Sequence, residues 1–200
     1  MKLLRNSVSV LAAAALAGCS LSSLMGGGAK TPTTLATLTP EAPDPGEVAR
    51  AAAAGQAITI QTPVISNELR TVRVPVQLTP SDVQYVTNLQ WVDTPDHLFQ
   101  HLLQETVRRT TSRVVLDPAQ AGLDPGIVLQ GELDRFGYDA STGQVVVAYN
   151  ASLSSANGTQ VQTRRFVATA PADDTGPSVG PALNRAANEV ALQVAKWIGG

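Results

Sequence analysis

The sequence predicts a two-layer α/β (α+β) sandwich, in which an antiparallel-rich sheet carries two main helices on one face. Three observations favour this class. Segments with period-two alternation and many β-branched residues recur from residue 57 to residue 168. An asparagine-glycine pair joins two of these segments, as in a tight hairpin. Residues 95–110 and 178–198 place apolar side chains at helical spacing.

Composition limits the functions that the chain can have. Aromatic residues make up only 4% of the sequence, so the core must consist mainly of aliphatic side chains. Without residues 1–18 the basic residues fall from 14 to 12 against 16 acidic ones, which gives a formal net charge of −4. This modest acidity, without a basic stripe, argues against a nucleic-acid partner.

Residues 1–18 have the features of a secretion signal. Lys2 and Arg5 precede an apolar run over residues 8–17 that is shorter than the roughly 20 residues needed to span a bilayer. The run ends in Leu16-Ala17-Gly18-Cys19, which resembles the lipobox of bacterial lipoproteins. The resemblance implies cleavage between Gly18 and Cys19, a diacylglycerol on the cysteine sulfur and an acylated amino terminus, with palmitate among the expected acyl groups.

The alternative for Cys19 is an ordinary free or buried thiol, and as the only cysteine it has no internal disulfide partner. Two or three acyl chains would hold the protein to a membrane permanently. Ser20 stands where an aspartate favours the inner membrane in Gram-negative sorting, so this analogy favours the outer membrane. Residues 19–33 should form a flexible tether that reaches roughly 45 Å when extended.

The first half of the domain, which spans residues 34–200, should contain short strands and a loose loop. The candidate strands are residues 34–38, 57–64 and 71–78, with a possible short strand at 83–86. Pro63 in the candidate 57–64 and Pro75 in the candidate 71–78 have no N–H to donate to a neighbouring strand. Pairing should therefore end at these prolines, or the strand should lie at an edge of the sheet. We expect residues 41–56 to be mobile, with at most one or two helical turns between residues 47 and 54.

The clearest helix signal begins at Thr94, which can accept backbone N–H bonds as the N-cap. Pro95 suits the first helical position, and Asp96 places negative charge in the first turn. The helix should run to about Thr110 and be followed by a strand at 113–116 and a turn-rich connection at 117–126.

The second half should supply three strands, at residues 127–138, 144–154 and 159–168, and a final helix at residues 178–198. Centring the hairpin on its Asn-Gly pair places Tyr149 opposite Phe166 and Val147 opposite Ala168 on a core face. The opposite face would carry polar side chains: Asn150, Ser152, Thr163 and Arg165. Pro181 is tolerated if it lies in the first turn of the helix.

Few side chains have the type and spacing of a catalytic or metal-binding site. His97 and His101 lie four residues apart on the predicted helix and could bind a metal, but no third ligand is marked by spacing, so we expect no metal and no cofactor. Glu132 and Asp134 share one face of a predicted strand, a pattern more typical of a charged outer surface than of a glycosidase. Trp91 either plugs the end of the core or contacts a partner.

Several segments in order resemble the ABC-type transport auxiliary lipoprotein family, which includes the PqiC-like lipoproteins. They are the lipobox, Ala36-Thr37-Leu38-Thr39-Pro40, the strand Val72 to Val76, the segment Tyr85 to Trp91 with Asn88-Leu89-Gln90 before the tryptophan, the helix start Thr94-Pro95, and an alanine-rich C-terminal helix. The resemblance runs from Cys19 to Trp197.

The resemblance implies a non-enzymatic, lipid-anchored auxiliary subunit that faces the periplasm. Its partners would be an ABC permease, an ATPase and an MCE-domain protein that move lipids or other hydrophobic compounds across the envelope, with Trp91 and Asn88 as candidate contacts. Two alternatives remain open: a structural lipoprotein that helps to assemble an outer-membrane machine, and a periplasmic hydrolase that uses His97 or His101.

Overall fold

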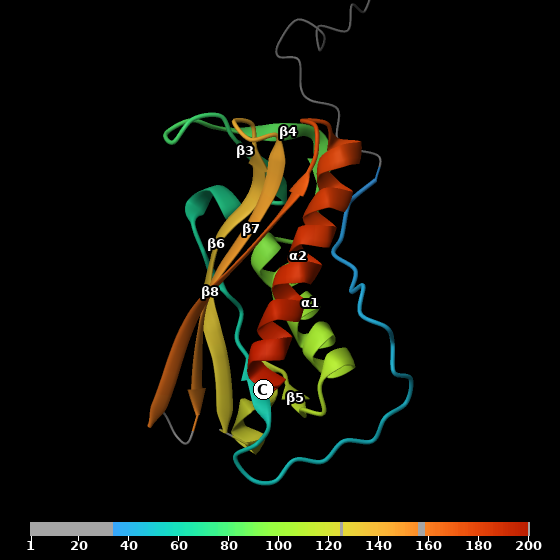
Figure 1. Ribbon diagram of the computed structural model, residues 1–200, viewed down its shortest axis with the longest axis vertical. Helices are drawn as coiled ribbons and strands as arrows, with labels where there is room; N and C mark the ends of the chain where they lie inside the picture. Colours follow the sequence, from blue (N-terminus) through green and yellow to red (C-terminus); the bar gives the residue numbers. More distant parts are fainter. Residues whose placement is uncertain (1–33, 125, 156–158, 200) are drawn as a thin grey trace, which may run out of the picture.

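The structure is a computed structural model that describes residues 34–124, 126–155 and 159–199, and it has one mixed sheet with two long helices on one face (Figure 1). This arrangement confirms the predicted fold class. The predicted signal, Cys19, the tether and the Asn157-Gly158 pair lie outside the described residues.

The sheet is built around its longest strand, β6 (Ile127–Asp139). One edge of β6 pairs antiparallel with β7 (Gln144–Ser155), and β7 pairs antiparallel with β8 (Gln160–Pro171). The other edge pairs in parallel with three short strands in succession, β1 (Ile58–Ile60), β2 (Val64–Ile65) and β3 (Arg73–Gln77). Two strands complete the far side: β4 (Val83–Gln90) on β3 and β5 (Val115–Leu116) on β1.

The β7–β8 hairpin has the register that its sequence predicts. Tyr149 lies opposite Phe166 and Val147 opposite Ala168, and all four side chains are buried. The ring of Tyr149 meets Phe99 of the first helix edge-on, with the centroids 5.3 Å apart. The hairpin therefore supplies part of the sheet's side of the core, together with β1, β3, β4 and β6.

Helix α1 (Pro95–Thr110) has the predicted bounds and buries the side of the helix that carries Leu98, Phe99, Leu102 and Leu103. One detail of its start was wrong. The side chain of Thr94 makes no capping hydrogen bond; instead, the Asp93 carboxylate accepts the Thr94 N–H at 2.7 Å. The carboxylate therefore lies near the helix N-terminus, where negative charge is favourable.

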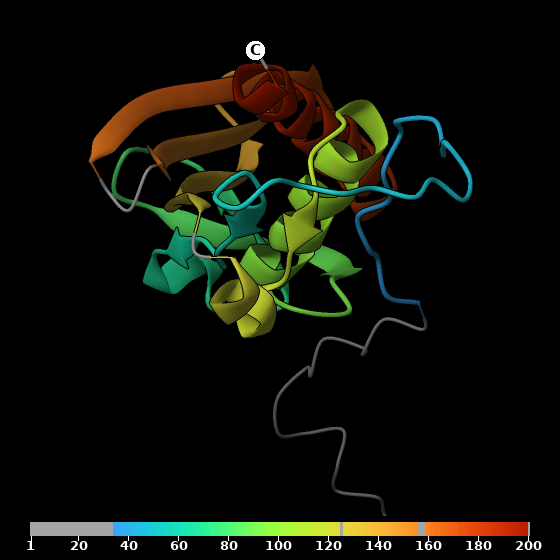
Figure 2. The same ribbon diagram turned by 90° about the horizontal axis from the view of Figure 1, so that it is seen from below.

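Helix α2 (Gly176–Gly199) begins two residues before the predicted start, so Pro181 lies just beyond the first turn instead of within it. The predicted apolar positions at residues 179, 183, 186, 190 and 194 are buried, and the sixth, Trp197, is partly buried against the core. Ala182, Ala187, Ala191 and Ala195 are buried as well, because α2 packs against α1 as well as against β7 and β8 (Figure 2). The buried surface of α2 is therefore wider than a single stripe.

The structure differs most from the sequence prediction in the strands of the first half of the domain. Residues 34–38 form only an isolated bridge between Ala36 and Trp91, and residues 57–64 divide at Pro63 into β1 and β2. Pro75 neither ends pairing nor lies at an edge: it stays inside β3, at a register irregularity where its missing N–H is tolerated. No helical turn occurs among described residues 47–54.

Candidate functional site

The N-terminal segment, residues 36–43, is the feature that connects the predicted anchor to the folded domain. Its first contact is a parallel bridge in which Ala36 N donates to Gln90 O at 2.8 Å and Ala36 O accepts from Val92 N at 2.9 Å. The segment then runs beside α2 (Figure 1). The tether would therefore leave the domain near the start of α2 and the end of β4.

Two asparagines one turn apart on α2 hold the segment by its backbone. Asn188 Oδ1 accepts from Glu41 N at 2.8 Å, and Asn188 Nδ2 donates to Thr39 O at 2.9 Å. Asn184 Oδ1 accepts from Thr39 N at 2.8 Å. Asn188 is only 7% exposed, although its place on the helical wheel suggested a polar surface position. Sequence reasoning missed this site, and two asparagines four residues apart were its only signal.

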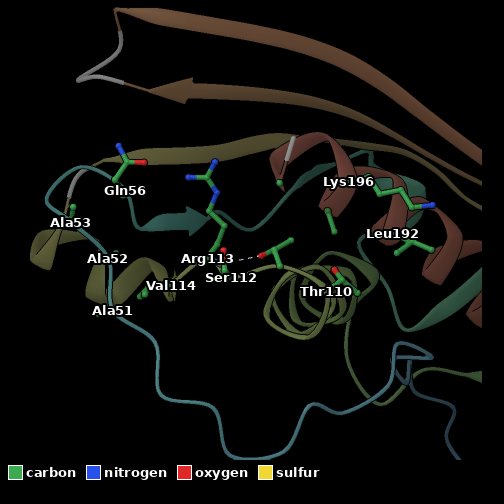
Figure 3. Close-up of a pocket in the computed structure, with 13 residues that line it drawn as sticks. Ala51, Ala52, Ala53, Gln56, Thr110, Ser112, Arg113, Val114, Leu192 and Lys196 are labelled. Atoms are coloured by element: carbon green, nitrogen blue, oxygen red, sulfur yellow. Dashed lines mark hydrogen bonds between the residues drawn. The ribbon is translucent and has the colours of Figure 1, made fainter.

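The loop that follows is fixed at both ends. At its start, Arg109 Nη1 donates to Ala42 O at 2.9 Å. At its end, the Asp124 carboxylate accepts from Gly55 N at 2.9 Å and from Ala57 N at 3.0 Å. The residues between are mostly exposed, and they border an open cavity of about 750 Å³ against the C-terminal ends of both helices (Figure 3).

The cavity has a mixed lining. Alanines 51–53 lie along the loop, Thr110 and Leu192 come from the two helices, and Arg113 follows α1. Arg113 Nη2 donates to Ile198 O at 3.0 Å, so its guanidinium is already partly satisfied. The lining contains neither a histidine nor a carboxylate. Its charged residues are Arg113 and Lys196.

The predicted contact residue Asn88 lies at the opposite end of the molecule, on β4. Its side chain is exposed, and its φ of 57° is the only positive φ among described non-glycine residues. It lines a cavity of about 510 Å³ together with residues 34–37 of the N-terminal segment and Gly176, Pro177 and Gly180 of α2. Asn88 is therefore accessible, and it lines this cavity together with Thr34, the first described residue.

Trp91 lies in the core. Its side chain is 1% exposed, and its ring centroid is 5.7 Å from that of Phe136. The structure thus agrees with the core alternative for this indole, and direct contact with a partner would need the core to open. Val92, the next residue, is 51% exposed.

The two histidines lie on an exposed part of helix α1. His97 Nδ1 lies 3.2 Å from Asp93 Oδ2, both side chains are about half exposed, and His101 is exposed. The N–H of Thr94, helped by His97, lowers the pKa of Asp93. No cluster of three or more potential metal ligands occurs in the described part of the chain.

The two strand carboxylates belong to the outer surface of the sheet. Asp134 Oδ2 lies 2.7 Å from Arg165 Nη2, and Arg165 Nη1 donates to Asn150 Oδ1 at 2.8 Å. Arg165 thus links the predicted polar face of the hairpin to Asp134 of β6, and this charged network is accessible to solvent. These contacts agree with the charged-surface alternative for this pair.

No helix in the described part of the chain is both long and apolar enough to cross a membrane.

The model of a family described as "ABC-type transport auxiliary lipoprotein component" matches residues 37–195. Among curated proteins, none matches this sequence.

Two crystal structures have a similar fold. One is of a protein from Xanthomonas campestris that is 17% identical, with a TM-score of 0.64 over 84% of this chain and 93% of that chain. The other is of an uncharacterized protein that is 14% identical, with a TM-score of 0.58 over 76% of this chain and 94% of that chain. At this identity the likeness concerns the fold alone.

Proposed function

Because this chain belongs to the ABC-type transport auxiliary lipoprotein family, we propose that it is a non-enzymatic, lipid-anchored subunit of an MCE-linked transport system in the cell envelope. The family match over residues 37–195 is the observation that carries this proposal. The system would move lipids or other hydrophobic compounds. The lipoprotein would act by protein contacts and by holding the complex near a membrane.

The anchor would be Cys19, acylated after cleavage behind Gly18. The backbone contacts of residues 36–42 support this arrangement, because they fix the side of the domain from which a tether would leave. Asn88 and the cavity beside it lie on that side. A partner that reaches the lipoprotein near the membrane would meet this surface first, and the Ser20 analogy favours the outer membrane.

Affinity capture of the full chain, solubilised with its lipids in a mild detergent, tests the proposal. We expect an MCE-domain protein and an ABC permease to be recovered together. The test variant is Asn88→Asp, which adds a charge at the proposed contact and tolerates the positive φ of 57°, so it should reduce the recovery of both without lowering the melting temperature. Recovery of neither partner with the unaltered protein would refute the proposal.

The same capture separates the alternatives. Recovery of an outer-membrane barrel protein without a permease would favour a role in assembly. A periplasmic hydrolase would need His97 or His101, and both are exposed, with the His97 ring within 3.2 Å of the Asp93 carboxylate. Unchanged transport with both His97→Ala and His101→Ala would agree with a non-enzymatic role.

A further inference from the structure

The outermost strand, β8, has a long unpaired edge. It pairs with β7 in an unbroken register from Gln160 opposite Ser155 to Pro171 opposite Gln144, and no other described strand pairs with it. Both views show the first half of β8 at the margin of the molecule, away from the helices (Figures 1 and 2). Such an edge presents a row of backbone N–H and C=O groups that can template another strand.

This edge has only part of the usual protection. Proteins protect edge strands with charged side chains, prolines, bulges or a covering element, and of these the stretch 160–170 has only the charges of Arg164 and Arg165. Residues 160–170 contain neither lysine nor proline, and their register with β7 has no bulge. All six residues from 160 to 165 are exposed, so this half of β8 is solvated on both faces. On the outer face, Val161 is 62% and Val167 is 44% exposed.

The charge of β8 limits what can pair with it. Its only charged residues are Arg164 and Arg165. Arg165 already pairs with Asp134, whereas the guanidinium of Arg164 lies 5.2 Å from the centroid of Phe166 and forms no ion pair within the described residues. Opposite charges on neighbouring strands attract, and like charges repel. A second copy pairing along the same stretch would gather four arginines, which disfavours self-association.

We propose that residues 160–167 of β8 bind an extended segment of a partner protein by strand addition. The segment carries a carboxylate opposite Arg164 on the helix-facing side and apolar side chains opposite Val161 and Val167 on the outer side. Backbone hydrogen bonds supply the affinity, and the side chains on the two faces supply the specificity. The inference rests on the fold and holds whether or not the transport role does.

A peptide of nine alternating valines and glutamates, blocked at both ends, is the test probe for the full mature chain in detergent. Amide hydrogen exchange, measured by NMR, reports the pairing. At a probe concentration roughly ten times its Kd, exchange of alternate amides between Gln160 and Val167 should slow about tenfold. Alternate amides are expected because only every second N–H of a strand points toward the added partner.

Two matched probes and two variants separate strand addition from simple charge attraction. The probe with lysine in place of glutamate should bind several-fold more weakly, and the glutamate probe N-methylated at every residue should not slow exchange. Arg164→Glu should reverse the preference between the acidic and basic probes, while Arg164→Gln should remove it. Melting temperatures of both variants check that the domain is still folded.

Three results would overturn the proposal. The first is no slowing with the glutamate probe, and the second is equal slowing with its N-methylated form. The third is slowing that depends on protein concentration without any probe, which would identify a second copy of the chain as the occupant. None of these outcomes bears on the capture of transport partners, so the two proposals fail separately.

Discussion

At the scale of single residues, two glycines of β6 let neighbouring elements approach closely. A Cβ at Gly131 would lie 2.8 Å from ring carbons of Tyr149 and still closer to the backbone oxygen of Asn150. A Cβ at Gly137 would lie 2.5 Å from Pro75 O. Neither contact can be relieved by rotating a flexible side chain. These glycines are therefore required by packing.

Gly131→Ala should lower the free energy of unfolding by about 1–3 kcal/mol, the usual range for overpacking a core. Chemical denaturation measures the change. The matched control is Gly122→Ala, because a Cβ there would meet nothing within 4 Å. Equal stability of the two variants would show that β6 and β7 can shift apart without cost.

Asp139 should contribute to stability in a pH-dependent way. The hydroxyl of Ser141 donates to its carboxylate at 2.6 Å and Arg135 Nη2 at 3.1 Å, and these interactions lower the pKa of Asp139 below 3.8. A carboxyl whose pKa is lower in the folded state stabilises fully above its unfolded pKa, and this contribution is lost as pH falls through the folded value.

Asp139→Asn should therefore cost about 1–2 kcal/mol at pH 7 and make the acid side of the stability profile less steep. Urea unfolding between pH 2 and pH 7 measures both effects. Ser141→Ala removes one donor and should give an intermediate profile. A variant whose stability falls with acid as steeply as that of the unaltered protein would contradict this role.

At the scale of elements, local and distant interactions differ in how well the sequence predicts them. Helix α1 and the β7–β8 hairpin were predicted correctly because their signals are local: a proline at the first helical position, apolar spacing and an Asn-Gly pair. The parallel pairing of β1, β2 and β3 with β6 joins residues far apart in sequence, and no local pattern marks it.

The N-terminal segment shows why one predicted strand did not form. Its alternating apolar residues suggested a strand at 34–38, but beyond Ala36 its backbone groups bond to the side chains of Asn184 and Asn188 and not to another strand. Side-chain amides can replace a ladder in this way, because each carries a donor and an acceptor. The pattern predicts an extended chain, but it does not predict the partner.

Asn188→Ala should release this segment. The substitution leaves Glu41 N and Thr39 O without partners at a part-buried site, so we expect a loss of about 1–3 kcal/mol. Hydrogen exchange at residues 39–42 should accelerate more than in the hairpin, and proteolysis in the loop should become faster. Glu189→Ala, at an exposed position one residue further along α2, is the control and should change little.

At the scale of the whole molecule, the contacts and the predicted anchor together suggest an orientation. Thr34 lines the same cavity as Asn88 and Gly176, at the start of α2, whereas the hairpin of β7 and β8 extends toward the other end (Figure 1). A tether from an anchored Cys19 would therefore join the domain at the end that carries Asn88, and the free part of β8 would lie at the opposite end. Sequence patterns could suggest Asn88 as a single position, but only the fold shows that it shares an end with Thr34.

The anchor itself gives the last prediction, and Cys19 is its centre. Cys19→Ser should keep residues 1–18 and leave the outer-membrane fraction, because no thiol remains to accept diacylglycerol, and two or more acyl chains are needed for permanent attachment. Ser20→Asp should stay lipidated but move toward the inner membrane, and Ser23→Asp is the matched control for added charge. Mass spectrometry of the mature N-terminus and membrane fractionation measure these outcomes. If the unaltered protein carried a bare Cys19, both the anchor and the orientation inferred from it would be wrong.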